Sequence, residues 1–150
     1  MEKPMYYEEY EIGASRTSGG RTITEADIVI HAGQTGDFYP QHMDAEFCRH
    51  TEFGQRIAHG TLTFCIGMGL QAADCVNPLA FSYGYDRMRF ITPVFIGDTI
   101  HTVVTIKEKR DDPKRPSKGF ITEKIEIFKQ DGKLAMVCEH IILCEKRPEK

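Results

Sequence analysis

The stretch from Arg56 to Cys75, RIAHGTLTFCIGMGLQAADC, constrains the fold more than any other part of the chain. Apolar and small residues cover nearly every face of a helix drawn over it, and a helix that is apolar all round is a buried helix. Its glycines, Gly60, Gly67 and Gly69, each cost up to about 1 kcal/mol in a helix interior. A chain tolerates this cost where another backbone must approach closely. We therefore expect a sheet that curls around the helix, with an ordinary, loosely packed core helix as the alternative.

The second half of the chain has the residue patterns of β-strands. The clearest alternation places Ile100, Thr102, Val104 and Ile106 on one face. Asp131-Gly132 is a strong hairpin turn signal. The expected strands lie over residues 15–24 at an edge, 82–90, 98–109, 120–128 and 134–144. Together these elements predict an α+β fold, with one long buried helix against an antiparallel sheet, in a single domain over residues 1–150.

Two further helices are expected before the long one. Thr24 is a good N-cap for the first, and Asp27 completes a variant capping box. This helix should stop before Asp37, because Pro40 disfavours the helical conformation of the residue that precedes it. A short second helix should begin with Asp44 as its N-cap.

Charge argues weakly against nucleic acid as a partner, because the formal net charge is −3 and phosphate-binding surfaces show clustered Lys and Arg. The most basic stretch, Lys107–Lys118, is interrupted by acidic residues. We interpret it as a solvated hairpin loop, and contact with an anionic ligand is the alternative.

No apolar run approaches the ~18 residues of a membrane helix, and the N-terminus lacks the apolar core of a signal peptide.

The five cysteines form no CxxC pair, which argues against a zinc knuckle or a redox motif. We interpret them as small buried hydrophobic residues in a reducing compartment, which predicts a cytoplasmic protein.

The segment TGDFYPQH, residues 35–42, places an acid and an imidazole five positions apart. Asp37 and His42 have the chemistry of an acid–base pair. The alternatives are that Asp37 is a turn residue satisfied by backbone amides, and that His42 is a polar residue ahead of the next helix. The remaining histidines His31, His50, His101 and His140 carry no motif and are expected at the surface or in the core.

Three stretches resemble the MaoC-like dehydratases, or (R)-specific enoyl-CoA hydratases, of the hotdog fold. Asp37-Phe38-Tyr39-Pro40-Gln41-His42 is similar to the Asp-x-Asn-Pro-x-His signature of that family. FGQRIAHG followed by the apolar helix and, later, MRFITPVFIGDTI are also typical of the family and occur in the same order. The chain departs from the pattern at Tyr39, where the family often has Asn.

The resemblance implies reversible hydration of an enoyl-CoA thioester to a 3-hydroxyacyl-CoA thioester. Asp37 and His42 would activate the water, and burial would raise the pKa of the acid. The Gly60 amide, at or near the start of the buried helix, would bind the thioester oxygen. Further residues assigned to substrate binding are Tyr39, Pro40, His59 and Arg56, with His59 more often a structural residue at such a position. The resemblance also implies a homodimer or higher homo-oligomer, with CoA thioester as substrate and neither cofactor nor metal.

Two other functions are compatible with the sequence. One is a hotdog acyl-CoA thioesterase, which generally places a single carboxylate elsewhere. The other is a non-catalytic acyl-binding subunit of a dehydratase, which the presence of both Asp37 and His42 disfavours. The sequence does not define the acyl chain.

Overall fold

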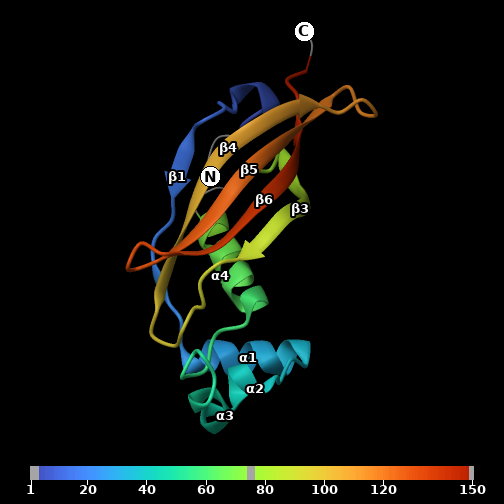
Figure 1. The fold of residues 1–150 in the computed structure, drawn as a ribbon. Coiled ribbons are helices and arrows are strands. Elements are labelled where there is room, and N and C mark those ends of the chain that lie inside the picture. Colours follow the sequence, from blue (N-terminus) through green and yellow to red (C-terminus); the bar gives the residue numbers. More distant parts are fainter. Residues whose placement is uncertain (1–3, 74–76, 149–150) are drawn as a thin grey trace.

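The computed structural model describes residues 4–73 and 77–148 and contains one sheet and four α-helices in that part of the chain (Figure 1). The strands are β1 (Ser15–Thr17), β2 (Arg21–Thr22), β3 (Ala80–Phe90), β4 (Thr99–Asp111), β5 (Lys118–Lys129) and β6 (Leu134–Glu145). The helices are α1 (Glu25–Thr35), α2 (Pro40–Met43), α3 (Ala45–Arg49) and α4 (Gly60–Ala73), and a short 3-10 helix spans Tyr7–Glu9.

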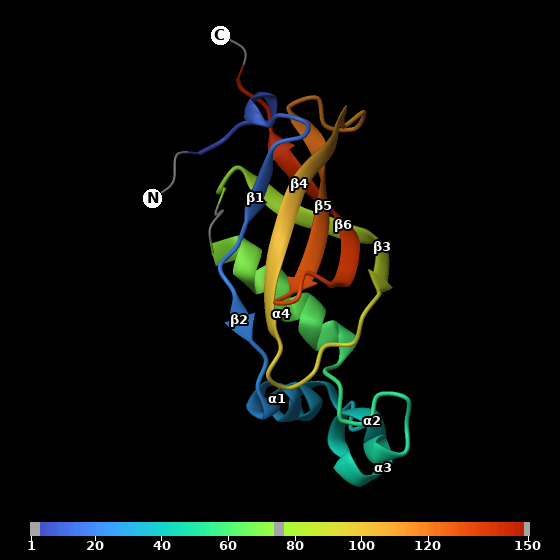
Figure 2. The same cartoon turned by 60° about the vertical axis from the view of Figure 1, so that its left-hand side comes forward.

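The sheet is six-stranded and its pairs are antiparallel, in the order β1-β4-β5-β6-β3, with β2 also paired to β4. All the expected strands are present, and the expected edge strand divides into β1 and β2. The β5–β6 turn contains Gly132 at φ 80°, the conformation that glycine adopts without steric cost. The sheet curves around α4, and α1, α2 and α3 gather where α4 begins (Figures 1 and 2). The prediction of an α+β fold is confirmed.

The helix expected from Arg56 starts later, at Gly60. Residues before it are extended, because Ile57 forms a β-bridge with Phe95 and the Ala58 amide donates to the Val94 carbonyl at 2.8 Å. Tertiary hydrogen bonds therefore replace the first expected turn. The expected end at Cys75 lies outside the described residues.

Helix α4 is buried on one face only, which corrects the expectation of burial on every side. Its buried residues are Leu62, Thr63, Gly67 and Gln71, and its exposed residues are Thr61, Cys65, Gly69, Ala72 and Ala73. The sheet covers a single side of the helix, and in this chain nothing among the described residues covers the other. The exposure of Cys65 also corrects its assignment as a buried cysteine.

Gly67 is the point of closest approach between α4 and the sheet. Its carbonyl accepts a hydrogen bond from Thr102 Oγ1 at 2.8 Å, and a Cβ atom there would lie 2.1 Å from Ile127 Cδ1. Gly69, by contrast, faces open space. The close-approach argument is therefore confirmed for Gly67 and wrong for Gly69. Around this contact the core consists of β4, β5 and β6 side chains, among them Ile100, Val104, Ile125, Ile127 and Met136.

The local signals of the first helices are confirmed. The Thr24 hydroxyl accepts from the Asp27 amide, and Asp27 reciprocates in a capping box at the start of α1. The Asp44 carboxylate accepts from the Phe47 amide at 2.9 Å at the start of α3. The four-residue helix α2 was not predicted.

The basic stretch Lys107–Lys118 is shorter as a loop than expected. Its first residues belong to β4 and its last residue begins β5, so only residues 112–117 form the hairpin loop. Cys48, Cys138 and Cys144 are buried, whereas Cys75 lies outside the described residues. Among the helices in the described ranges, none is long and apolar enough to cross a membrane.

Candidate active site

The end of α1 places Asp37 in a tight polar turn. Gly36 adopts the left-handed conformation at φ 78° and its amide donates to the Ala32 carbonyl, which closes the helix. The Asp37 amide then donates to Thr35 Oγ1, and Asp37 Oδ1 accepts from the Tyr39 amide, each at 3.3 Å. Asp37 remains exposed in the single chain, so the burial expected for this acid is not present.

His42 is held in one orientation by a backbone carbonyl. Pro40 begins α2, a position where its missing N–H costs nothing, and His42 lies one half-turn later with 7% of its surface exposed. Its Nδ1 lies 2.8 Å from the carbonyl oxygen of Ile57. Because a carbonyl only accepts, Nδ1 carries the proton and Nε2 is left as an acceptor.

His59 immediately precedes α4 and is almost fully buried, with 1% of its surface exposed. Its Nε2 donates to the carbonyl oxygen of Asp37 at 2.9 Å, so the ring links the Asp37 turn to the start of α4. Its Nδ1 is buried and has no hydrogen-bond partner among the described residues. The tautomer fixed by Asp37 makes this atom a free acceptor.

Three imidazoles lie close together. The His42 and His59 rings are stacked, with centroids 3.8 Å apart and ring planes at 25°, and the His31 ring is tilted by 57° against that of His59, with centroids 4.9 Å apart. Burial lowers the pKa of His42, and the neighbouring His59 lowers it further, against the opposing effects of the Ile57 carbonyl and Asp37. Burial and His59 also lower the pKa of His31. The neutral forms of His31 and His42 are therefore favoured at neutral pH.

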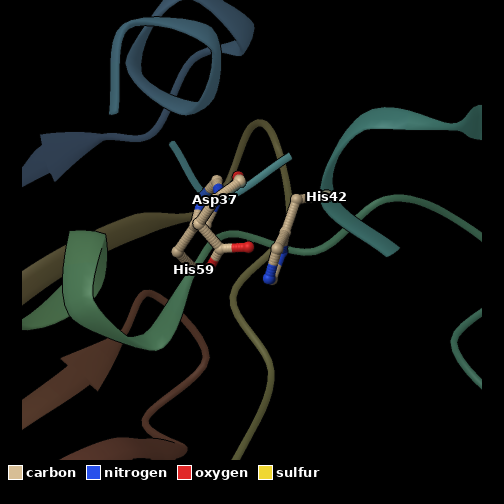
Figure 3. Close-up of side chains that lie close together, drawn as sticks. All are labelled: Asp37, His42 and His59. Carbon is tan, nitrogen blue, oxygen red and sulfur yellow. The ribbon is translucent and has the colours of Figure 1, made fainter. Parts of the chain in front are cut away.

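Asp37, His42 and His59 converge on one space. One oxygen or nitrogen atom from each lies within 4.8 Å of the others, and the Asp37 carboxyl group is turned toward His42 (Figure 3). The three residues line a cavity of about 450 Å³ together with Gly60 and Thr61. The expected convergence of acid, imidazole and helix start is therefore present in the geometry.

Gly60 is the first residue of α4, so its amide has no acceptor within the helix. The ring of Phe90 packs directly on it, and a Cβ at this position would lie 2.7 Å from Phe90 Cζ. A side chain at position 60 would therefore have to displace the Phe90 ring. Phe90 itself is 53% exposed and lines the same cavity.

The other residues predicted from sequence lie around the cavity rather than in it. Tyr39 is 56% exposed with its ring 6.4 Å from that of His42, and Pro40 contributes by starting α2. The Arg56 guanidinium pairs with Glu25 at 2.7 Å, and neither Tyr39, Pro40 nor Arg56 is part of the cavity wall.

His31 is a site residue that the sequence analysis missed. It lies on the face of α1 that carries Ile28 and Ala32, all of them buried, and its Nε2 lies 2.8 Å from Thr61 Oγ1. Its spacing of three from Ile28 was the available signal, because residues three apart share a helix face.

Asp37, His42 and His59 bring together three atoms of the kinds that bind metal ions. A metal is bound in the plane of each imidazole, along the nitrogen lone pair. The His42 and His59 rings are stacked nearly parallel, so a single ion cannot lie in both planes. The stacking of the two rings therefore does not suit a single metal ion bound by both of them.

Residues 9–126 match the family described as MaoC like domain, and the chain belongs to this family. It is 40% identical over 104 residues to Protein MaoC of Klebsiella aerogenes, covering 69% of this chain and 31% of that protein. It is 35% identical over 117 residues to the (R)-specific enoyl-CoA hydratase of Rhodospirillum rubrum, covering 78% of this chain and 76% of the relative. The chain thus spans about a third of the first relative and most of the second.

Solved structures agree with the assignment. An Archaeoglobus protein named as a monoamine oxidase regulatory protein matches with a TM-score of 0.90 and 36% identity over 97% of each chain. A Mycobacterium tuberculosis protein, Rv0216, described as a double hotdog fold, matches with a TM-score of 0.83 over 98% of this chain and 46% of its own. Its 16% identity shows the fold alone. The predicted hotdog fold is confirmed.

Proposed function

We propose that the protein reversibly hydrates an enoyl-CoA thioester to a 3-hydroxyacyl-CoA thioester. The observation that carries this proposal is the convergence of Asp37 and the free Nε2 of His42 on a cavity that begins at the N-terminus of α4. The names of relatives support it, since they include (R)-specific enoyl-CoA hydratases and a 3-hydroxybutyryl-CoA dehydratase.

Water activation is assigned to the Asp37–His42 pair. Neutral His42 takes a proton from the water through Nε2 as the water oxygen attacks the β carbon. The Asp37 carboxylate accepts the other hydrogen bond of that water and stabilises the imidazolium that forms. The imidazolium then returns a proton to the α carbon, so that one molecule of water is added overall.

The thioester oxygen gains negative charge as the enolate develops. We assign its stabilisation to the Gly60 amide, because a helix N-terminus carries unpaired donors and the positive end of the helix dipole. A preorganised donor at this place acts on the charge that appears only during the reaction. His59 lines the same cavity and is assigned to substrate binding, while its unpartnered Nδ1 is buried away from the cavity surface.

Residues beside the cavity are assigned to substrate binding. These are Tyr39 and Pro40, next to the cavity wall, and Arg56, which reaches the CoA phosphates only after exchanging its contact with Glu25. The proposal includes no cofactor and no metal, with the CoA thioester as substrate. We further propose a cytoplasmic location on the basis of the unpaired thiols Cys48, Cys65, Cys138 and Cys144.

The test is the loss of the conjugated enoyl absorbance of crotonyl-CoA in the presence of the protein. We expect this loss without release of free thiol, and we expect Asp37→Asn and His42→Ala each to reduce kcat/KM by about 100-fold or more, as general acid–base groups do. Glu52→Gln, at an exposed position outside the cavity, is the matched control and should leave the rate unchanged.

Other outcomes identify the competing functions. Release of free thiol would indicate a thioesterase, and no turnover of crotonyl, branched or dicarboxylic enoyl-CoA would indicate an acyl-binding subunit. Near-normal turnover in a folded Asp37→Asn or His42→Ala variant would remove the role assigned to that residue.

A further inference from the structure

A buried ion pair holds the connection between β3 and β4, which passes close to the start of α4 (Figure 2). Lys129 Nζ, at the end of β5, lies 2.6 Å from Asp98 Oδ2, with 7% and 11% of the two side chains exposed. Lys129 Nζ also donates to the Pro93 carbonyl at 3.2 Å, and Asp98 Oδ2 accepts from the Phe95 amide at 2.8 Å. The ion pair therefore ties the connection to β5 at two points.

The surroundings of Asp98 keep it a carboxylate. Burial alone would raise its pKa, but the hydrogen bonds from Gln130, Lys129 and the Phe95 amide together hold the pKa of Asp98 below its ordinary value. The Gln130 side-chain amide donates to Oδ1 at 2.8 Å, so both carboxylate oxygens have partners. Because desolvation offsets much of the attraction within a buried ion pair, the main effect of this pair is on the geometry of the connection.

The connection in turn holds the extended segment that precedes α4. The Ala58 amide donates to the Val94 carbonyl at 2.8 Å, and Ile57 forms a β-bridge with Phe95. Val94 is buried in the core. The position of the Ile57 carbonyl therefore depends on where the connection is held.

The Ile57 carbonyl is the group that orients the proposed base. It accepts from Nδ1–H of His42 at 2.8 Å, which leaves Nε2 free to take a proton from water. If the proton moved to Nε2, that atom would no longer be a base. A continuous series of contacts thus runs from the ion pair, through two backbone segments, to His42.

We propose that Lys129 and Asp98 are positioning residues for the hydration, and that they act on His42 through the Ile57 carbonyl. This inference rests on the proposed function, in which His42 is the base. Neither Lys129 nor Asp98 lines the candidate active-site cavity, so their effect on the reaction passes through the backbone. Without the ion pair, the connection is released from β5 and the Nδ1–H tautomer of His42 loses the acceptor that favours it.

The tautomer of His42 can be measured by NMR of protein that contains nitrogen-15-labelled histidine, because the two ring nitrogens differ in protonation. The test variant is Lys129→Met, which keeps an apolar stem and loses the charge and the hydrogen bond to Pro93. We expect the Nδ1–H form of His42 in the wild type and averaging of the two tautomers in Lys129→Met. His42→Ala assigns the signals, and the readout does not depend on activity.

The kinetic readout is hydration of crotonyl-CoA. Lys129→Met should reduce kcat by about 10- to 100-fold, as a small displacement of a catalytic group does, with little change in KM. The hydrogen bond to the Ile57 carbonyl raises the pKa of His42, so weakening this bond should move the acid limb of the kcat/KM profile to lower pH. His59 and Asp37, which also face His42, are unchanged in this variant.

Two further variants separate positioning from a loss of folding. Lys124→Met makes the same substitution on the same strand and removes the 2.7 Å ion pair with Glu126, and it should behave as the wild type. The double variant Lys129→Met/Asp98→Asn leaves neither charge of the pair unpaired in the interior. It should therefore fold, as circular dichroism checks, and should still show averaged tautomers of His42 and the loss of kcat.

The outcomes distinguish this inference from the proposed function. The Nε2–H form of His42 in the wild type, or a folded Lys129→Met variant with the wild-type tautomer and kcat, would overturn the positioning role. Absence of crotonyl-CoA turnover by the wild type, together with averaged tautomers in Lys129→Met, would contradict the hydratase and support the link between the ion pair and His42.

Discussion

A single carbonyl group determines which nitrogen of His42 is available for chemistry. The Ile57 carbonyl accepts a hydrogen bond from Nδ1–H of His42, and a shift of the extended segment 56–59 would break this bond. The Asp37 carbonyl acts in the same way on His59 through Nε2. At the residue scale, therefore, backbone acceptors set the tautomers of both imidazoles that face the cavity.

The pH dependence of hydration follows from the surroundings of His42. The base must be neutral, and burial together with His59 lowers its pKa from the ordinary value of 6.5. A lowered pKa keeps His42 neutral as the pH falls through 6.5, so kcat/KM for crotonyl-CoA should decline only at more acidic pH. The measurement is a pH profile of kcat/KM between about pH 4.5 and 8.

His50 provides the control for this profile, because its side chain is 80% exposed and lies outside the cavity. His50→Gln should leave the acid limb in place. A wild-type limb at or above pH 6.5 would contradict the assignment of buried His42 as the base.

At the scale of the element, the glycines of α4 differ in what surrounds them. Gly67 meets Ile127 and Thr102 of the sheet, whereas Gly69, two residues later, meets no atom within 4 Å of an added Cβ. The two positions therefore separate the effect of close packing from the effect of helix propensity.

Gly67→Ala should destabilise the fold by about 1–3 kcal/mol, because the new methyl group overlaps Ile127 and forces the sheet and helix apart. Gly69→Ala should be neutral or stabilise by up to about 1 kcal/mol, because alanine favours the helix. Urea unfolding followed by circular dichroism measures both. Equal destabilisation by the two substitutions would show that Gly67 does not mark a close approach.

At the scale of the whole molecule, the uncovered surface points to a second copy of the chain. The outer face of α4 is exposed at Thr61, Cys65 and Gly69. Strand β3 lies at an edge of the sheet and carries large exposed side chains, namely Phe81, Tyr83, Tyr85 and Phe90. Clustered exposed apolar groups of this kind mark interaction sites, and we propose that a homodimer covers them.

The oligomeric state can be measured by analytical ultracentrifugation. The wild type should sediment with twice the mass of one chain. Cys65→Arg, which places a charge on the exposed face of α4, should shift the equilibrium toward the monomer. Lys133→Glu, on the β5–β6 turn, is the control and should remain dimeric. A wild-type monomer at micromolar concentration would contradict the proposal.

Local signals in the sequence were sufficient for most of the elements. The Thr24–Asp27 capping box and the Asp44 cap positioned two helices, and alternation over residues 98–109 identified β4 and its buried face. These features depend on neighbouring residues, so no knowledge of distant contacts was needed. The late start of α4 was missed because the Ile57 amide donates to the Gln41 carbonyl and the Ala58 amide donates to the Val94 carbonyl, both distant in the sequence.

The sequence by itself determined the α+β class, the apolar helix and the pairing of an acid with an imidazole in one loop, because caps, turns and periodicity act over a few residues. Only the tertiary structure decided the tautomers of His42 and His59 and the proximity of His31 to them. His42 and His59 lie 15 and 22 positions from the residues whose carbonyl groups hold their rings. Their proximity arises from strand register and helix packing, which no local pattern encodes.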